Sequence, residues 1–256
     1  HHRRWMWSTR SVNNITVNGH GQVPHSANST GRITAFRTTK TIDVVVGEAA
    51  DAYRIPATGS GRKSEGGERR LLKRFSRAII FVKPELIIVY DRLVATGPSS
   101  FQYWLHSPGK FAVADQRHIR LRCHDVLCEI DFLSPQGLTF RQTDQYDPNP
   151  WPQLRLREWH LTAETPRKSN TVEFVALYRP HRAGQAVPHQ ASLRPLPGGY
   201  LLQAALSDGD VVALLPVDDA AILRADGLQT RGAILVQRRR PDGSVVQTVS
   251  LAETSR

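Results

Sequence analysis

Apolar residues in this chain recur with the two-residue period of β-strands, and the helical spacing of apolar positions is almost absent. Short alternating or β-branched runs, bounded by Gly, Pro, Asn and Asp, follow one another along the sequence. The runs that predict strands are Asn14–Asn18, Arg32–Arg37, Ile42–Glu48, Leu71–Val82, Leu86–Ala95, Phe101–Leu105, His118–Cys123, Leu127–Leu133, Leu154–Thr162, Thr171–Tyr178, Tyr200–Ala205, Val211–Pro216, Ala233–Arg239 and Val245–Leu251. Because these are too many strands for one flat sheet, we expect an all-β chain that forms a large, mostly antiparallel, multi-stranded β-sandwich.

The strongest hairpin signal is the pair of apolar segments Arg77–Val82 and Leu86–Arg92, with Pro84 in the turn between them. Proline suits such a turn because its missing N–H is not needed there. After Pro197 the chain alternates apolar strands with Asp-Gly turns, which are typical of hairpins. We therefore expect one unit over residues 1–196, and hairpins over residues 197–256 that complete or extend the sandwich.

Composition restricts the class of protein and of partner. The 40% hydrophobic and 22% charged content fit a globular chain, and no apolar run approaches the roughly 18 residues of a membrane span. The 34 Lys+Arg against 23 Asp+Glu give a net charge of +11, and 28 of the basic residues are Arg. Guanidinium groups suit carboxylate or sulfate, so an anionic partner is favoured, although an Arg-rich proteome gives the same excess with no partner. The charges are scattered, and no RNA-recognition motif, KH loop or basic helix occurs, so we expect no nucleic-acid partner.

The two cysteines, Cys123 and Cys128, flank a predicted hairpin turn. A cross-strand disulfide and two free thiols are both compatible with this spacing. A zinc site would need more ligands at recognised spacing than these two residues and one histidine between them.

The segment Trp5–Gln22 concentrates aromatic rings, amides, an arginine and glycine turns. Amides hydrogen-bond hydroxyls and carboxylates, and indole faces offer apolar area to pyranose rings. This segment is therefore suited to an acidic polysaccharide. The alternative is a strand with a polar hairpin, in which Asn18-Gly19 forms the turn and the Trp residues belong to the core.

Four stretches, in order, resemble the heparinase II/III-like polysaccharide lyases. Ser8–Gln22 resembles the family segment T-x-A-H-N-x-I-x-V-x-G-x-G-Q, and Arg77–Arg92 resembles its R-x-x-x-F-V-K-P-x-x-x-V-V-x-D hairpin. Tyr103–Ser107 is similar to W-L-L-H-S, and Glu158–Leu161 with Phe174–Pro180 fits a later strand pair. The resemblance covers Trp5 to Pro180.

The resemblance implies an architecture and a reaction. Family members join an N-terminal helical toroid to a C-terminal β-sandwich, and the substrate cleft lies between the two parts. The implied reaction is β-elimination at a uronic acid: the C5 proton is removed, the carboxylate is neutralised and the O4 leaving group is protonated. Since the chain begins without Met or an apolar signal core, we expect a fragment that lacks the helical domain and the main catalytic residues, and that is inactive alone.

The resemblance also suggests which residues contact substrate and where the family pattern is broken. Val12 stands where the family has a histidine that can bind a structural metal, so we expect no metal or other cofactor in this fragment; the role of His1 and His2 is left open. The candidate substrate-binding residues are Arg10, Asn13, Asn14, His20, Gln22 and His106.

Two functions follow as expectations. The first is the C-terminal part of a lyase for an acidic polysaccharide such as a glycosaminoglycan or alginate, with the missing helical domain and the polysaccharide as partners. The resemblance places such a lyase in the periplasm or outside the cell. The second is a non-catalytic carbohydrate-binding or structural β-sandwich module.

Overall fold

The computed structural model describes residues 5–55, 68–145 and 158–253, and strands that pair antiparallel are the main elements of the described chain. His1, His2 and the start of the predicted strand Leu154–Thr162 lie outside these ranges. Within the described part, no helix is long and apolar enough to cross a membrane.

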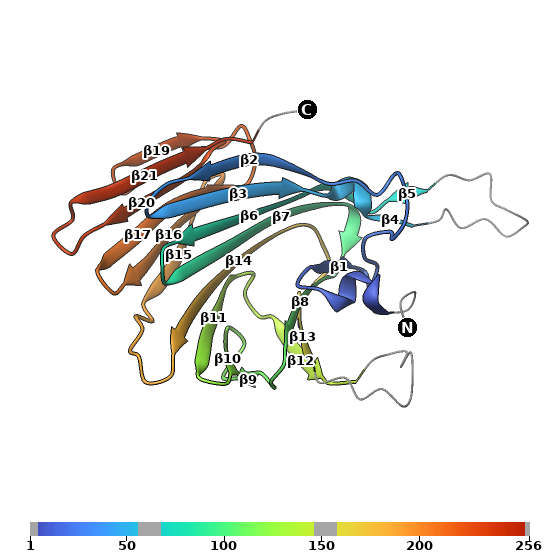
Figure 1. Cartoon of the computed structure of the whole chain (residues 1–256). Coiled ribbons are helices and arrows are strands. Elements are labelled where there is room, and N and C mark those ends of the chain that lie inside the picture. The colour runs from blue at the N-terminus through green and yellow to red at the C-terminus, as the bar shows by residue number, and fades with distance from the viewer. Residues whose placement is uncertain (1–4, 56–67, 146–157, 254–256) are drawn as a thin grey trace, which may run out of the picture.

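The centre of the molecule is an eight-stranded sheet, which we call the main sheet (Figure 1). In spatial order its strands are β2 (Arg32–Thr38), β3 (Ile42–Glu48), β6 (Leu72–Val82), β7 (Leu86–Ser99), β14 (Ser169–Arg182), β11 (Val126–Ser134), β10 (His118–Cys123) and β9 (Ala112–Val113).

A four-stranded sheet, the small sheet, covers part of one face of the main sheet. Its order is β1 (Ile15–Val17), β8 (Phe101–Ser107), β13 (Trp159–Glu164) and β12 (Thr139–Thr143). The two sheets enclose an aromatic core that includes Phe75, Tyr103, Phe132 and Phe174. Alternate residues of β8 are buried there, and the residues between them face outward. The small sheet therefore presents a regular row of polar and aromatic side chains.

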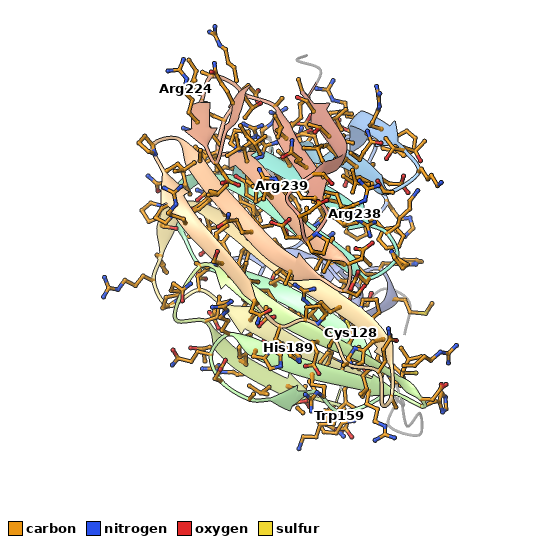
Figure 2. All side chains as sticks on the ribbon, turned by 90° about the vertical axis from the view of Figure 1, so that its left-hand side faces the viewer. Cys128, Trp159, His189, Arg224, Arg238 and Arg239 are labelled. Atoms are coloured by element: carbon orange, nitrogen blue, oxygen red, sulfur yellow. The ribbon has the colours of Figure 1, made fainter. Side chains whose placement is uncertain are left out.

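A five-stranded C-terminal sheet covers the opposite face of the main sheet (Figures 1 and 2). Its order is β15 (Ala191–Leu196), β16 (Gly199–Leu206), β17 (Gly209–Pro216), β20 (Ile234–Arg239) and β21 (Val245–Leu251). The core between these sheets is aliphatic, with Val44, Ile80, Leu202 and Val236 fully buried. Each such side chain contributes about 1.5–3 kcal/mol by leaving water.

Two short strand pairs and two 3-10 turns complete the described structure. The pairs are β4 (Arg54–Ile55) with β5 (Arg69–Arg70), and β18 (Ile222–Ala225) with β19 (Leu228–Arg231); the turns are η2 (Thr9–Ser11) and η3 (Ala50–Ala52).

The expected all-β, mostly antiparallel sandwich is confirmed, and the structure adds that it has three layers. The predicted central hairpin is β6 with β7, which pair from Leu72 opposite Ala95 to Val82 opposite Leu86. Where the main sheet is covered on both faces, its strands are near-continuous apolar runs such as Leu86–Tyr90.

The cysteine hairpin is also present, formed by β10 and β11, but the two cysteines are not opposite each other. Cys123 pairs with Val126 and Cys128 pairs with Leu121, and both thiols are free. The disulfide that the spacing left open is therefore absent from this structure.

Candidate functional site

The segment that bears most of the predicted site residues folds back on itself through a tight turn. Asn18 and Gly19 have positive φ angles of 52° and 77°, and a bridge joins Val17 to His20. Asn-Gly is favoured at such positions because both residues tolerate φ above zero. The turn holds β1 beside β8 as an edge strand of the small sheet, and Ile15 of β1 pairs with Tyr103 of β8.

Thr9 connects the two arms of this segment. Its Oγ1 accepts a 2.7 Å hydrogen bond from the backbone N–H of Gln22, and its side chain lies directly over Gly21. A Cβ atom at position 21 would lie 2.3 Å from Thr9 Oγ1, so only glycine fits this close approach.

Asn13, His106 and Arg10 meet at the end of β8. Asn13 Oδ1 accepts a 2.9 Å hydrogen bond from the backbone N–H of His106 and lies 3.1 Å from the ring Nδ1. The other ring nitrogen, Nε2, lies 2.8 Å from the carbonyl oxygen of Arg10 and must donate to it, because a carbonyl only accepts. His106 thus ties the N-terminal segment to the small sheet.

Burial sets the protonation of the two histidines in this region. It lowers the pKa of His106 below the ordinary value of about 6.5, against the opposing effects of Glu158 and the Arg10 carbonyl. Burial likewise lowers the pKa of His160, whose Nε2 donates to the Gln145 carbonyl at 2.7 Å. Burial therefore favours the neutral form of both rings.

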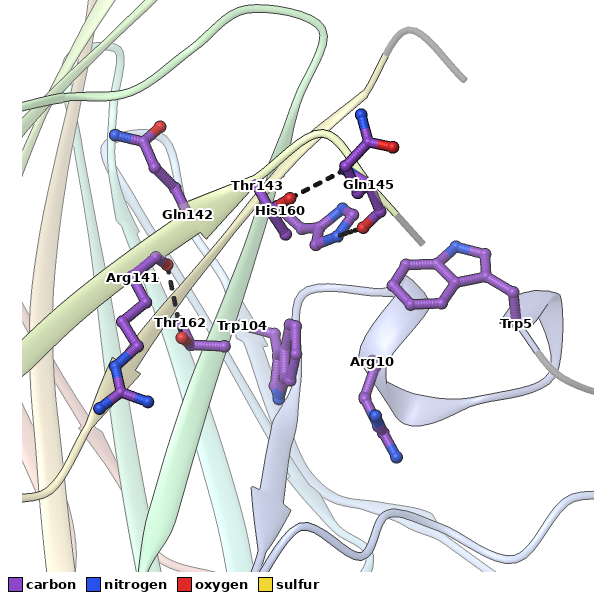
Figure 3. Close-up of a pocket in the computed structure, with 9 residues that line it drawn as sticks. All are labelled: Trp5, Arg10, Trp104, Arg141, Gln142, Thr143, Gln145, His160 and Thr162. Carbon is purple, nitrogen blue, oxygen red and sulfur yellow. Dashed lines mark hydrogen bonds between the residues drawn. The ribbon is translucent and has the colours of Figure 1, made fainter. Parts of the chain in front are cut away.

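A hollow of about 270 Å³ opens beside this cluster, and we call it the aromatic pocket (Figure 3). The Trp5 ring centroid lies 4.9 Å from that of His160, and the Trp104 centroid lies 6.4 Å from it. The lining combines these three rings with two arginines, two amides and two hydroxyls: Trp5, Arg10, Trp104, Arg141, Gln142, Thr143, Gln145, His160 and Thr162. Ring faces with surrounding polar groups are suited to sugar binding.

Strand alternation and register explain the composition of this pocket. Trp104 on β8 pairs with Thr162 on β13, which in turn pairs with Arg141 on β12. Because directly opposed residues in a sheet point to the same face, these side chains line the pocket together.

A second hollow, of about 350 Å³, lies on the uncovered part of the main sheet and includes Asn14 and Gln22 in its lining. Arg77 also lines it. Its Nε and Nη2 bond the two oxygens of the buried Asp91 at 2.6 and 2.9 Å, and its Nη1 donates to the Asn13 carbonyl at 2.9 Å. Arg77 therefore connects Asp91 of the main sheet to the backbone of Asn13.

The predicted site residues thus fall into three groups. Arg10 lines the aromatic pocket and contacts His106, which also bonds Asn13; Asn14 and Gln22 line the second hollow. His20 is exposed in the Asn18-Gly19 turn and lines neither of these hollows.

Several lining residues were not selected from the sequence, chiefly Trp104, Arg141, His160 and Arg77. Trp104 lies inside the segment that resembles W-L-L-H-S, two residues before His106, and strand alternation places the two on one face. His160 lies in the similar stretch Glu158–Leu161, but a lone histidine on a strand is more often structural. Arg141 gave no comparable signal, because its place in the pocket depends on the pairing of β12 with β13.

The residues present do not form a metal site in the described ranges. No group of three or more His, Cys, Asp or Glu side chains there is arranged to hold a metal ion, and the exposed Val12 side chain has no ligand atom. They do not fit the metal ion that the resemblance implies for other family members, so no step below depends on one.

The fold and the pocket together define a class of architecture: an all-β sandwich with an aromatic, polar pocket on its small sheet. Comparison with solved structures identifies proteins that have a similar fold. Heparan sulfate lyase HepC from Pedobacter heparinus superimposes with a TM-score of 0.58 at 15% identity, over 82% of this chain and 31% of that one. Heparinase III, the BT4657 gene product, gives 0.56 at 12% identity over 97% and 31%, and a further heparinase III gives 0.52 at 10% over 97% and 31%.

These matches confirm the heparinase-like β-sandwich that the sequence motifs indicated. The chain spans about a third of the length of these lyases. No protein-family model and no curated protein sequence matches it.

Proposed function

We propose that this chain is the β-sandwich part of a polysaccharide lyase that cleaves an acidic, uronate-containing polysaccharide by β-elimination. The observation that carries the proposal is the aromatic pocket beside Asn13 and His106, on a fold shared with heparan sulfate lyases. In this role the chain forms one wall of the substrate cleft.

The chain's own residues bind and orient substrate. Trp104 and Trp5 supply ring surface for sugar residues, and Asn13 offers its amide N–H to the uronate carboxylate, since its Oδ1 is held by the backbone of His106. Neutralising that carboxylate lowers the cost of removing the C5 proton, because negative charge accumulates on it in the transition state.

His106 is a positioning residue in this scheme. Its Nε2 proton is committed to the Arg10 carbonyl and its Nδ1 faces Asn13 Oδ1, so neither nitrogen is directed at a substrate proton. We assign the base and the acid for the O4 leaving group to the part of the lyase that this chain does not span.

The proposed partner is a helical domain, and an uncovered apolar face of the main sheet supports its docking. Ile33, Phe36 and Ile79 are 71%, 63% and 40% exposed, and Phe36 pairs with Val45, which pairs with Ile79. A contiguous exposed apolar surface of this kind is typical of an interaction site. We also propose a periplasmic or extracellular location, in keeping with the similarity to lyases of polysaccharide.

The test is to express the complete product of the coding region and to follow the ultraviolet absorbance of the unsaturated uronate on heparan sulfate, heparosan and alginate. Growth of absorbance with one of them, and its loss in an Asn13→Ala variant that remains folded, is the expected result. A complete product that binds these glycans without generating the chromophore would replace the lyase by a carbohydrate-binding module.

A further inference from the structure

Two arginines flank the ring of Trp104 in the aromatic pocket. In Figure 3 the indole lies between the side chains of Arg141 and Arg10. The topology agrees with this view: β12, which carries Arg141, lies beyond β13 on one side of β8, whereas Arg10 precedes β1, which lies on the other side.

Neither guanidinium is neutralised by the described part of the protein. Arg10 and Arg141 are exposed, and their side chains make no hydrogen bond or ion pair within residues 5–55, 68–145 and 158–253. Many other arginines of this chain meet an acid: Arg238 bonds both oxygens of Asp208, and Arg239 bonds Asp226. Two charges without acidic partners in the described residues therefore lie at one pocket and are available to an anion.

The surface between the two arginines is held in place by hydrogen bonds. Trp104 Nε1 donates to Thr16 Oγ1 at 2.9 Å, and Thr16 donates to Gln102 Oε1 at 2.7 Å. A fixed ring lowers the ordering cost of stacking a sugar on it.

We propose that Arg10 and Arg141 are specificity-determining residues that select a glycan with anionic groups on both sides of the sugar residue stacked on Trp104. The inference rests on the proposed function, and it adds that two anionic groups of the glycan, one on each side of the stacked residue, contribute to binding. Guanidinium groups bind carboxylate and sulfate through paired N–H donors, so uronate carboxylates and sulfate esters both satisfy the two arginines. An alternating polysaccharide also satisfies both arginines when its uncharged residue stacks on Trp104, because a uronate then lies on each side of that residue.

The test is calorimetric titration of this chain, at fixed ionic strength, with four tetrasaccharides. They are a polyuronate from alginate, a sulfated one from heparan sulfate, an unsulfated one from heparosan and neutral cellotetraose. The three acidic tetrasaccharides should bind more tightly than cellotetraose, which offers no anion to either arginine. Arg10→Gln and Arg141→Gln should each weaken binding of the first two about tenfold or more, because each removes a charge-assisted pair of hydrogen bonds.

The matched control is Arg224→Gln, which removes one exposed charge from the opposite side of the molecule (Figure 2). Its Kd should stay within about twofold of the unmodified chain, whereas a loss equal to that of Arg141→Gln would reduce the effect to net charge and overturn the proposal. Equal affinity for cellotetraose and the polyuronate, or no binding of any acidic tetrasaccharide, would also overturn it.

Different experimental results would refute the proposed function and this inference. Arginine-dependent binding by a complete product that generates no unsaturated uronate would refute the lyase and support the role of the two arginines. A lyase whose KM is unchanged by Arg10→Gln and Arg141→Gln would refute the role of the two arginines and leave the lyase intact.

Discussion

Replacing Arg77 by methionine should destabilise the chain by about 3–5 kcal/mol, the range for breaking a buried ion pair by removing one partner. The Asp91 carboxylate is fully buried, and Arg77 supplies two hydrogen bonds to it and a third to the Asn13 carbonyl. Methionine keeps much of the packing that the guanidinium makes over the Phe75 and Tyr103 rings, so the loss measures the charge and its hydrogen bonds.

The stability of the Arg77→Met variant should also change with pH in a defined direction. Burial raises the pKa of Asp91, and Arg77 is the group that opposes it. Without Arg77 the folded state holds the Asp91 proton more tightly than the unfolded state does. The variant should therefore lose further stability as pH rises above about 4, the ordinary pKa of an aspartate.

Urea denaturation followed by circular dichroism measures the effect, with Arg182→Met as the control. Arg182 pairs with Asp125 at the surface, where both side chains are about 70% exposed, so its loss should cost at most about 1 kcal/mol. The double variant Arg77→Met, Asp91→Leu should recover part of the loss, because no buried charge is left unpaired. An equal loss of unfolding free energy in Arg77→Met and Arg182→Met would refute the reasoning.

Three further predictions follow from the site and the cysteine hairpin. Because burial lowers the pKa of both His106 and His160, unfolding free energy should fall as pH drops through about 6.5, and a variant with both replaced by glutamine should show a flatter profile in urea titrations at pH 5 to 8. Gly21→Ala should lower stability by about 1–3 kcal/mol, since its new methyl group meets Thr9; an unchanged melting temperature would contradict the close approach. Burial raises the pKa of Cys128 to about 12, so mass spectrometry should find this thiol unalkylated by iodoacetamide at pH 8 in the folded chain and modified in urea.

Strands were predictable from the sequence where apolar periodicity is strong, and were missed where it is weak. The edge strand β12 contains only one strongly apolar residue, Phe140, so its alternation carries no clear signal. The edge strand β15 contains Pro195, which argues against a central strand but is tolerated at a sheet edge.

The candidate site shows the same division between local and long-range information. Asn13 and Arg10 belong to one continuous segment, and the Asn18-Gly19 turn can be predicted from residue type alone. The contact of Arg10 with His106, and the meeting of Trp104 with Arg141, depend on which strands become neighbours. A single sequence does not encode that register in any local pattern.

The strand order of the main sheet has a consequence for how the chain acquires its structure. The central strand β14 pairs with β7 on one side and β11 on the other, and its partner β7 is separated from it by the whole of β8 to β13. Closing so long a loop is entropically costly and slow, whereas the C-terminal sheet is built largely from adjacent hairpins that form quickly. Those hairpins cover β3, β6 and β7 on one side of this junction as well as β14 and β11, so their aliphatic core is complete only after β14 has joined the two halves of the main sheet. The rate of refolding should therefore be limited by the pairing of β14 with β7. A chain truncated before Ser169 should form two separate parts of the main sheet that are prone to aggregate.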